Sequence, residues 1–258
     1  MDSRTHTYFA SDFHLGLKAG TDPLERERHV VRWLTEISST AKSIYLVGDL
    51  FDFWWEYKMV VPKGFTRFLG KISELTDAGV EVHFFTGNHD MWIGDYLAKE
   101  CGMILHTGEY RFELNGRRFC VAHGEGVGVR DKKYLALLWV FRNRFLRSLY
   151  SMLHPRIGIA LAHRWSLSSR LAKSYSREFR GEEKEPLVRY AREAMQDDDI
   201  DFFIFGHRHI PLDLSLSEKN RLLILGNWFN APVYADWNGE EMTLREYKSD
   251  GYLKAGDN

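Results

Sequence analysis

Residues 43–52 read SIYLVGDLFD, and this stretch decides the class of fold. Its first half is a short apolar run typical of a buried β-strand, and a glycine followed by an aspartate ends it. Two other apolar runs end in a similar way, residues 8–11 at Asp12 and residues 80–85 at Gly87-Asn88. Three strands that each end in a loop with Asp or Asn indicate that ligands gather at one edge of a sheet.

Helical patterns separate these strands, over residues 23–37 and 64–76. Strands that alternate with helices predict a mostly parallel sheet with right-handed crossovers. Further along, Asn115-Gly116 and Asn238-Gly239 are typical of tight hairpin turns, and the last segment of the chain is rich in strand-like runs. We therefore predict an α/β fold in which two sheets pack face to face with helices outside.

The composition is that of an ordinary globular protein, with 258 residues of which 44% are hydrophobic and 28% charged. This length predicts a single domain over residues 1–258. The net charge of −1 gives no general support for a nucleic-acid partner. Cys101 and Cys120 lack metal-binding spacing and fit a reducing compartment. There is no signal-peptide pattern and no long apolar run, so a cytoplasmic protein is expected.

Residues 130–184 break the alternation of strands and helices. They hold 13 Lys and Arg against 4 Asp and Glu, together with many large apolar residues in a helical pattern. This charge asymmetry predicts an inserted helical cap that is both basic and apolar. Within it, Trp139, Phe141 and Phe145 either line a chamber or pack the cap on the core, and packing is the simpler interpretation.

Five short segments, each following an apolar run, carry the candidate functional residues. They are Asp12-Phe13-His14, Gly48-Asp49-Leu50-Phe51-Asp52, Gly87-Asn88-His89-Asp90, Ala122-His123-Gly124 and Gly206-His207-Arg208-His209. Carboxylates, an amide and imidazoles without thiolates favour ions such as Mn²⁺, Fe or Zn²⁺ over a structural zinc site. Side chains two residues apart in an extended chain point to the same side, so each Asp-x-His or His-x-His pair can reach one ion.

Together and in this order, the five segments resemble the calcineurin-like metallophosphoesterases over most of the catalytic core. That resemblance implies a four-layer αββα sandwich, which agrees with the two sheets expected above. It also implies two divalent metal ions, with Mn²⁺ the expected metal and Fe or Zn²⁺ as alternatives. By the family pattern Asp12, His14, Asp49 and His209 hold one ion, and Asp49, Asn88, His123 and His207 hold the other, so that Asp49 bridges them.

The same resemblance implies a reaction in which a hydroxide shared by the two ions attacks phosphorus. His89 is then a catalytic residue rather than a ligand, facing the phosphate to stabilise the transition state or protonate the leaving oxygen. Asp52 is expected to orient His89. The alternative for Asp52 is an aspartate that only caps its own loop.

Two shorter stretches and the cap resemble a narrower family, the UDP-2,3-diacylglucosamine pyrophosphohydrolases of lipid A synthesis. The stretches are residues 48–54 (GDLFDFW) and 225–228 (LGNW). The resemblance implies a lipid-linked nucleotide-sugar substrate, cleaved to UMP and 2,3-diacylglucosamine 1-phosphate. It implies an enzyme peripheral to the cytoplasmic face of the bacterial inner membrane. Ser169, Arg170 and Lys173 fall in the region that contacts substrate, although a solvated helix face explains them equally well.

The chain departs from the best-known members of this narrower family at two positions. His89 replaces the usual arginine, and Glu125 follows His123-Gly124 where an aspartate is usual. The alternative is therefore a phosphodiesterase or nuclease of the same superfamily that acts on another phosphodiester. A scaffold that has lost its chemistry is a third reading, but it predicts missing ligands, and all seven candidate positions are present.

Overall fold

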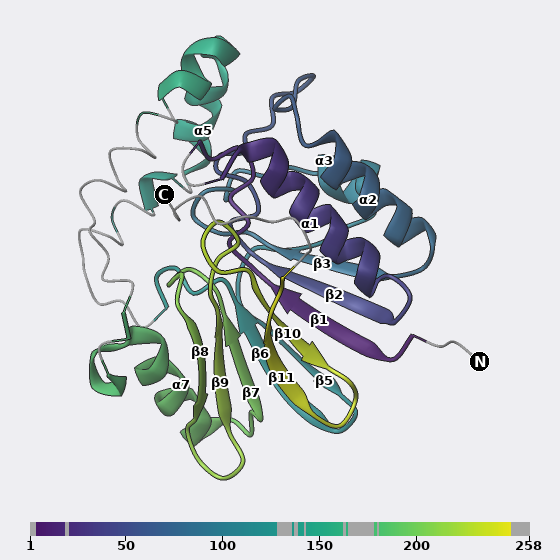
Figure 1. The fold of residues 1–258 in the computed structure, drawn as a ribbon. Coiled ribbons are helices and arrows are strands. Elements are labelled where there is room, and N and C mark those ends of the chain that lie inside the picture. The colour runs from purple at the N-terminus through teal and green to yellow at the C-terminus, as the bar shows by residue number, and fades with distance from the viewer. Residues whose placement is uncertain are drawn as a thin grey trace, which may run out of the picture.

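The computed structural model describes residues 4–18, 21–127, 136, 139–141, 143–161, 164, 178–179 and 181–248. Their strands form two sheets at the centre of the molecule (Figure 1). The six-stranded sheet has the order β11 (Met242–Glu246), β10 (Val233–Trp237), β1 (His6–Ala10), β2 (Ala41–Val47), β3 (Glu81–Phe85), β4 (Ile104–His106). The five-stranded sheet has the order β5 (Tyr110–Leu114), β6 (Arg117–Ala122), β7 (Phe202–Phe205), β9 (Arg221–Leu225), β8 (Pro211–Ser215).

The strands that carry the candidate residues pair in parallel, as predicted. β1 pairs in parallel with β2, β2 with β3, and in the second sheet β6 with β7. Their carboxyl ends therefore meet along one side of the double sheet. The two predicted hairpins are also confirmed, since β5 pairs antiparallel with β6 and β10 with β11. Asn115 and Gly116 both adopt positive φ, as a tight primed turn requires.

Helices cover both outer faces of the double sheet. The helices α1 (Pro23–Ile37), α2 (Thr66–Asp77) and α3 (Tyr96–Cys101) lie against the six-stranded sheet, and α7 (Pro186–Asp197) covers the other (Figure 1). In β2, Ile44 and Leu46 face the first helical layer, whereas Tyr45 and Val47 face the second sheet. This alternation gives each strand two buried faces, and it confirms the four-layer αββα sandwich.

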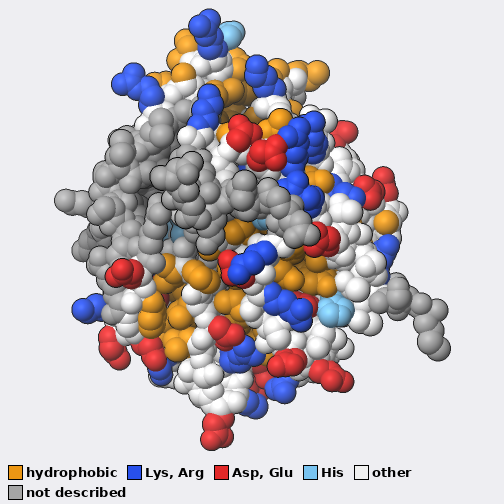
Figure 2. Space-filling model, viewed as in Figure 1, with side chains coloured by type: hydrophobic (Ala, Val, Ile, Leu, Met, Phe, Trp, Pro, Cys, Tyr) orange, Lys and Arg blue, Asp and Glu red, His pale blue; other side chains and the backbone are white. Residues whose placement is uncertain are grey.

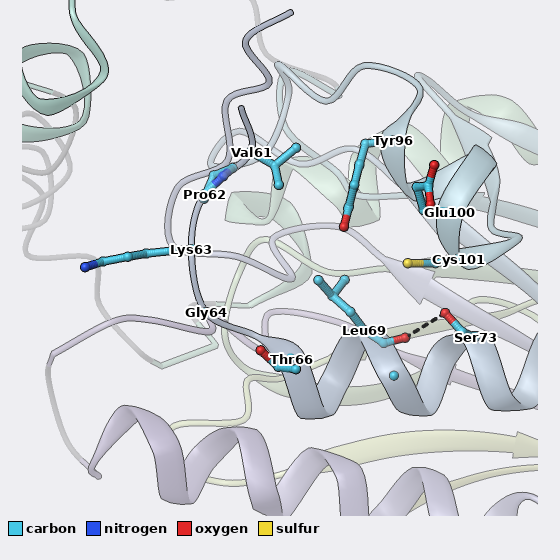
Figure 3. A pocket seen from close by; sticks show the side chains of 11 residues that line it. Val61, Pro62, Lys63, Gly64, Thr66, Leu69, Ser73, Tyr96, Glu100 and Cys101 are labelled. Atoms are coloured by element: carbon cyan, nitrogen blue, oxygen red, sulfur yellow. Dashed lines mark hydrogen bonds between the residues drawn. The ribbon is translucent and has the colours of Figure 1, made fainter. Parts of the chain in front are cut away.

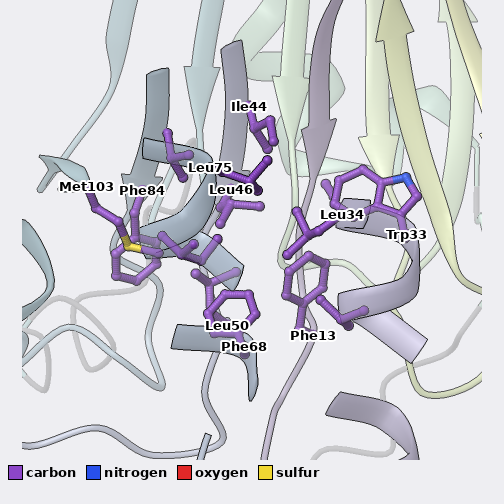
Figure 4. Close-up of a cluster of buried hydrophobic side chains, with 14 of the residues drawn as sticks. Phe13, Trp33, Leu34, Ile44, Leu46, Leu50, Phe68, Leu75, Phe84 and Met103 are labelled. Atoms are coloured by element: carbon purple, nitrogen blue, oxygen red, sulfur yellow. The ribbon is translucent and has the colours of Figure 1, made fainter. Parts of the chain in front are cut away.

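Three apolar clusters hold the four layers together. The first joins α1, α2 and α3 to the six-stranded sheet, and Figure 4 shows Trp33 from α1 on one side of this cluster, Phe84 from β3 on the other, and Phe68 from α2 between them. The second lies between the sheets and contains Phe9 and Phe119. A third lies under α7. Burial of such side chains stabilises the fold by about 1.5–3 kcal/mol each.

Several elements differ from the sequence prediction. The second helix begins at Thr66 rather than near residue 64, because Phe65 adopts a left-handed conformation with φ 59° just before it. The strand β8 was not predicted: its alternating Leu212 and Leu214 are a strand signal, but Pro211 at its start is typical of an edge and weakens it. The helices α3 and α7 were also missed. The 3-10 turn η1 (Glu182–Lys184) lies at the end of the predicted helical cap.

Part of the predicted cap is described. It contains the helix α5 (Arg144–Ser151), which projects beyond the sandwich in Figure 1. Phe141 packs on Trp92, whose Nε1 donates to the Phe141 carbonyl at 2.9 Å, so packing on the core is the outcome for this residue. Packing was the wrong expectation for Trp139 and Phe145, which are 65% and 76% exposed.

The remaining cap predictions are not tested by the structure. Ser169, Arg170 and Lys173 lie outside the described residues, and the boundaries of the cap at about 130 and 184 stay a prediction. Among the helices that the structure describes, none combines the length and the apolar composition that crossing a bilayer requires.

Candidate metal centre

The five segments predicted from sequence converge at the carboxyl ends of β1, β2, β3, β6 and β7. Main-chain hydrogen bonds join the first two loops, from Asp12 N to the Gly48 carbonyl and from His14 N to the Asp49 carbonyl, both 3.0 Å. A third joins the loops of the second sheet, from Gly206 N to the His123 carbonyl at 3.0 Å. The structure therefore brings all five segments into one site.

Most of the candidate ligands have an unusual backbone conformation. Seven described non-glycine residues have positive φ, and five of these are candidate ligands: Asp12, His14, Asp49, His207 and His209. Each such residue costs about 1–2 kcal/mol relative to an ordinary conformation. Strain of this kind persists only where the surrounding structure enforces it, and it concentrates at functional sites.

Four side chains form the first group of metal-binding atoms. Asp12, His14, Asp49 and His209 each place one ligand atom within 4.8 Å of the others. His209 Nε2 lies 2.9 Å from Asp12 Oδ1, and His14 Nε2 lies 3.1 Å from His209 Nε2. These separations are the distances between neighbouring ligands around a single cation. The first ion predicted from sequence fits this group.

A second group shares Asp49 with the first. Asp49, His123 and His207 also place ligand atoms within 4.8 Å of one another, and His123 Nε2 lies 3.4 Å from Asp49 Oδ2. Within the described part of the chain, Asn88 Oδ1 and His123 Nε2 are buried and have no hydrogen-bond partner. Buried polar atoms left in this way are rare and point to a missing ion or water. The donor set fits two cations with Asp49 between them.

The protonation of these side chains also suits cations. Burial opposes ionisation of Asp12 and Asp49, but neighbouring imidazoles, chiefly His209 and His123 respectively, hold the pKa of each carboxyl well below its usual range. Burial lowers the pKa of His14 to about 4, so its ring is neutral near pH 7. Neutral imidazoles and ionised carboxylates are the ligand forms that metals need.

His123 differs from the other histidines of the site. Burial alone would lower its pKa, yet Asp49 outweighs burial and raises the pKa of His123 well above its usual value. Its Nδ1 donates to the Val47 carbonyl at 2.8 Å, which leaves Nε2 facing Asp49. A cation at this position would take the place of the Nε2 proton.

His89 and Asp52 are adjacent, as predicted, but the contact is not the one expected. His89 Nδ1 donates to the main-chain carbonyl of Asp52 at 2.9 Å, whereas the Asp52 Oδ1 atom lies 3.8 Å away. This bond leaves His89 Nε2 as the atom available to a substrate. The ring of His89 lies 5.0 Å from that of His14, centroid to centroid, beside the first group of ligands.

Asp90 is a buried residue of the candidate site to which no role was assigned from the sequence. It is fully buried, and its two carboxylate oxygens accept hydrogen bonds from Gly87 N and Leu50 N, both at 2.7 Å. Burial, followed by repulsion from Asp49, raises the pKa of Asp90 to about 8. Asp90 thereby joins the loops of Asp49 and Asn88. One signal of this role was present in the sequence, which is that Asp90 belongs to the same segment as Gly87 and the candidate ligand Asn88.

Arg26 was also missed. It lies on the buried face of α1 and donates from Nη1 to the carbonyls of His14 at 2.9 Å and Leu17 at 3.1 Å. It therefore supports the loop that carries Asp12 and His14. A buried arginine on the apolar face of a helix, four residues before Val30, was the signal in the sequence.

A separate hollow of about 420 Å³ lies between α2 and α3 (Figure 3). Lys63, Tyr96, Glu100 and Cys101 are among its lining residues, and none of the candidate site residues is. Burial raises the pKa of the Cys101 thiol, so it is not an activated nucleophile. This hollow does not belong to the metal centre.

Comparison with known proteins agrees with this geometry. Residues 5–211 match the family described as calcineurin-like phosphoesterase. The chain therefore belongs to the calcineurin-like phosphoesterases, and it is a metal-dependent hydrolase with a site for divalent ions.

Among individual proteins, it is similar to the UDP-2,3-diacylglucosamine hydrolase of Porphyromonas gingivalis, at 44% identity covering 93% of this chain and 97% of that protein. Proteins of the same name from Klebsiella pneumoniae and Vibrio cholerae are similar at 28% and 25% identity. These matches cover 86% and 93% of this chain and 90% and 97% of the relatives.

Proposed function

We propose that this chain hydrolyses the pyrophosphate bond of UDP-2,3-diacylglucosamine to UMP and 2,3-diacylglucosamine 1-phosphate, a step of lipid A synthesis. The observation that supports hydrolysis most strongly is the position of Asp49, which belongs to both groups of metal-binding atoms. The substrate is supported by the names of the relatives, which the chain covers almost over their full length.

In the proposed site, Asp12, His14 and His209 hold one ion, Asn88, His123 and His207 hold the other, and Asp49 lies between them. When bound, two divalent ions lower the pKa of a water and neutralise charge on the phosphoryl oxygens. Mn²⁺ is the proposed metal, because a mixture of carboxylate, amide and imidazole ligands suits it. The ligand residues of the chain would hold the positive charges of the ions in place before the substrate binds.

His89 is proposed to handle the proton of the leaving group. Because Nδ1 is held by the Asp52 carbonyl, the imidazolium form presents its second N–H at Nε2. From there it donates to a phosphoryl oxygen or to the oxygen that leaves with cleavage of the bond. A positioned group of this kind contributes about 10²–10⁴-fold to the rate.

The described part of the cap supports a lipid substrate and a peripheral position on the cytoplasmic face of the inner membrane. On and beside α5, Phe145, Leu149 and Met152 are 76%, 55% and 80% exposed. Figure 2 shows apolar side chains interleaved with Lys and Arg at the top of the view, over α5. Helices that combine exposed apolar and basic residues bind to anionic membrane surfaces.

The test uses the purified chain, stripped of metal with a chelator and then reloaded with Mn²⁺. Incubation with UDP-2,3-diacylglucosamine in detergent micelles is expected to release UMP, measured by chromatography, only after reloading. Asp49→Ala is expected to release none, while Glu240→Gln, an exposed carboxylate in the β10–β11 turn, serves as a matched control. A chain that releases no UMP but cleaves bis(p-nitrophenyl) phosphate would support the alternative, a phosphodiesterase acting on another substrate.

A further inference from the structure

The loop that carries His207 and His209 is held in a strained conformation. Both histidines have positive φ, 65° and 56°, and Arg208 N between them donates to the Gly206 carbonyl at 2.7 Å. The ends of the loop are fixed at the main chain, since His207 N donates to Asp12 Oδ2 at 3.0 Å and Asn227 Nδ2 donates to the His209 carbonyl at 3.1 Å. Arg208 lies at the centre of the loop, and its side chain is held by a contact outside the loop.

That restraint is an ion pair with Glu185. Arg208 Nε lies 2.8 Å from Glu185 Oε1 and 3.0 Å from Oε2, and the two side chains are 15% and 3% exposed. Glu185 is the residue immediately before α7, and its main-chain carbonyl accepts from Arg189 N at 3.1 Å. A buried carboxylate fixed at the start of a helix therefore sets the position of the arginine side chain.

We propose that Glu185 is a positioning residue for the His207 and His209 ligand pair, acting through Arg208. The inference rests on the proposed metal site. Because Arg208 is bonded in the chain to both histidines, a shift of its side chain would turn the left-handed backbone on either side and move both imidazoles. The histidines belong to different groups of metal-binding atoms, so Glu185 supports the binding of both ions.

The start of α7 also supports the neighbouring ligand loop. A Cβ atom added at Gly124, the residue after His123, would lie 3.2 Å from Leu187 Cδ2 in the first turn of α7. The first turn of α7 therefore packs directly beneath the loop of His123, while Glu185 holds the loop of His207. The candidate ligands that follow β6 and β7 are thus anchored at one place, the residues that directly follow the predicted cap.

The experiment compares Glu185→Ala and the near-isosteric Glu185→Gln with the wild type. The control is Glu182→Gln. Glu182 lies three residues before Glu185, and its exposed carboxylate pairs with Arg192. Each metal-free protein is titrated with Mn²⁺ alone, and free Mn²⁺ is followed by electron paramagnetic resonance. Glu185→Ala is expected to raise the Mn²⁺ dissociation constant by about tenfold or more, as loss of a group that orients metal ligands does. Glu185→Gln is expected to be intermediate, because its amide oxygen keeps one acceptor, and Glu182→Gln is expected to bind like the wild type.

Turnover provides the second readout. At limiting Mn²⁺, Glu185→Ala is expected to show a lower kcat than Glu182→Gln with an unchanged KM, and the deficit in kcat is expected to shrink as the Mn²⁺ concentration is raised. A raised KM at saturating Mn²⁺ would mean that the Glu185–Arg208 pair meets the substrate, and it would overturn the inference. Wild-type Mn²⁺ affinity in Glu185→Ala would overturn it too, whatever the melting temperature of that variant. If the wild-type chain binds two Mn²⁺ ions but releases no UMP, the proposed function fails and the positioning role of Glu185 is still decided by the titration.

Discussion

Replacing Gly87 with alanine perturbs Asp49, the proposed bridging carboxylate, without straining the backbone. The added Cβ would lie 2.3 Å from Asp49 Oδ1 and 2.6 Å from Asp49 N, whereas ordinary contacts begin near 3.4 Å. Relief of this overlap requires a displacement of about 1 Å between the two loops. Misplacement by that distance costs about 100-fold in rate, or about 2.7 kcal/mol in the activation barrier. Overpacking of this kind destabilises the fold by about 1–3 kcal/mol, which the whole chain should withstand.

The assay measures UMP release and Mn²⁺ content for Gly87→Ala beside Gly70→Ala as the control. Gly70 lies in α2, and an added Cβ there meets nothing within 4 Å, so the control should gain about 0.5–1 kcal/mol in stability and keep full activity. Gly87→Ala is expected to lose about 100-fold in kcat while its circular dichroism spectrum stays native. Wild-type kcat and metal content in Gly87→Ala would refute the placement of Asp49 at the reacting centre.

Three further predictions concern other parts of the molecule. His89 Nδ1 bonds to the Asp52 main-chain carbonyl rather than to its carboxylate, so Asp52→Asn should lower kcat less than about tenfold. His89→Gln should lower kcat about 10²–10³-fold. Equal losses of kcat in the two variants would contradict this prediction. Burial, then Arg32, lowers the pKa of His29 to about 4. The unfolded chain therefore binds one more proton there between about pH 4 and 6.5. As the pH is lowered from about 6.5 to 4, the free energy of unfolding should fall by up to about 1.4 kcal/mol per pH unit. Denaturant titrations in chelator should show a shallower slope for His29→Gln, and an unchanged slope would be evidence against this. The double variant Phe145→Ser with Leu149→Ser should bind anionic vesicles at least about tenfold more weakly in flotation assays with its Mn²⁺ content unchanged, since both side chains are exposed; wild-type flotation would argue against membrane contact through α5.

The sandwich and the candidate ligand segments were predictable because buried parallel strands appear in the sequence as continuous apolar runs. The apolar runs before Asp12 and Asp49 have no polar alternation, since one face meets helices and the other meets the second sheet. The abrupt change to Asp or Asn at the end of each run marks the edge where ligands collect. Hairpin turns at Asn115 and Asn238 depend only on local backbone preference, and they too were predicted correctly.

The features that were not predicted from the sequence depend on contacts between residues far apart in the chain. No local pattern predicts a left-handed conformation at Asp49 or His207, because glycine or asparagine is the usual residue there and only the converging loops enforce it. The Glu185–Arg208 pair spans 23 residues, and the role of Asp90 depends on a loop 40 residues away. For Asp52, the sequence predicted a neighbour of His89, but side chain and main chain cannot be distinguished without coordinates.

The two-ion site is tested most directly by a crystal structure of the chain grown with Mn²⁺, with anomalous difference maps recorded at the manganese edge. Two peaks roughly 3.5–4 Å apart are expected, one among Asp12, His14 and His209 and the other among Asn88, His123 and His207, with the Asp49 carboxylate between them. A single peak, or a pair of peaks that Asp49 does not bridge, would contradict it.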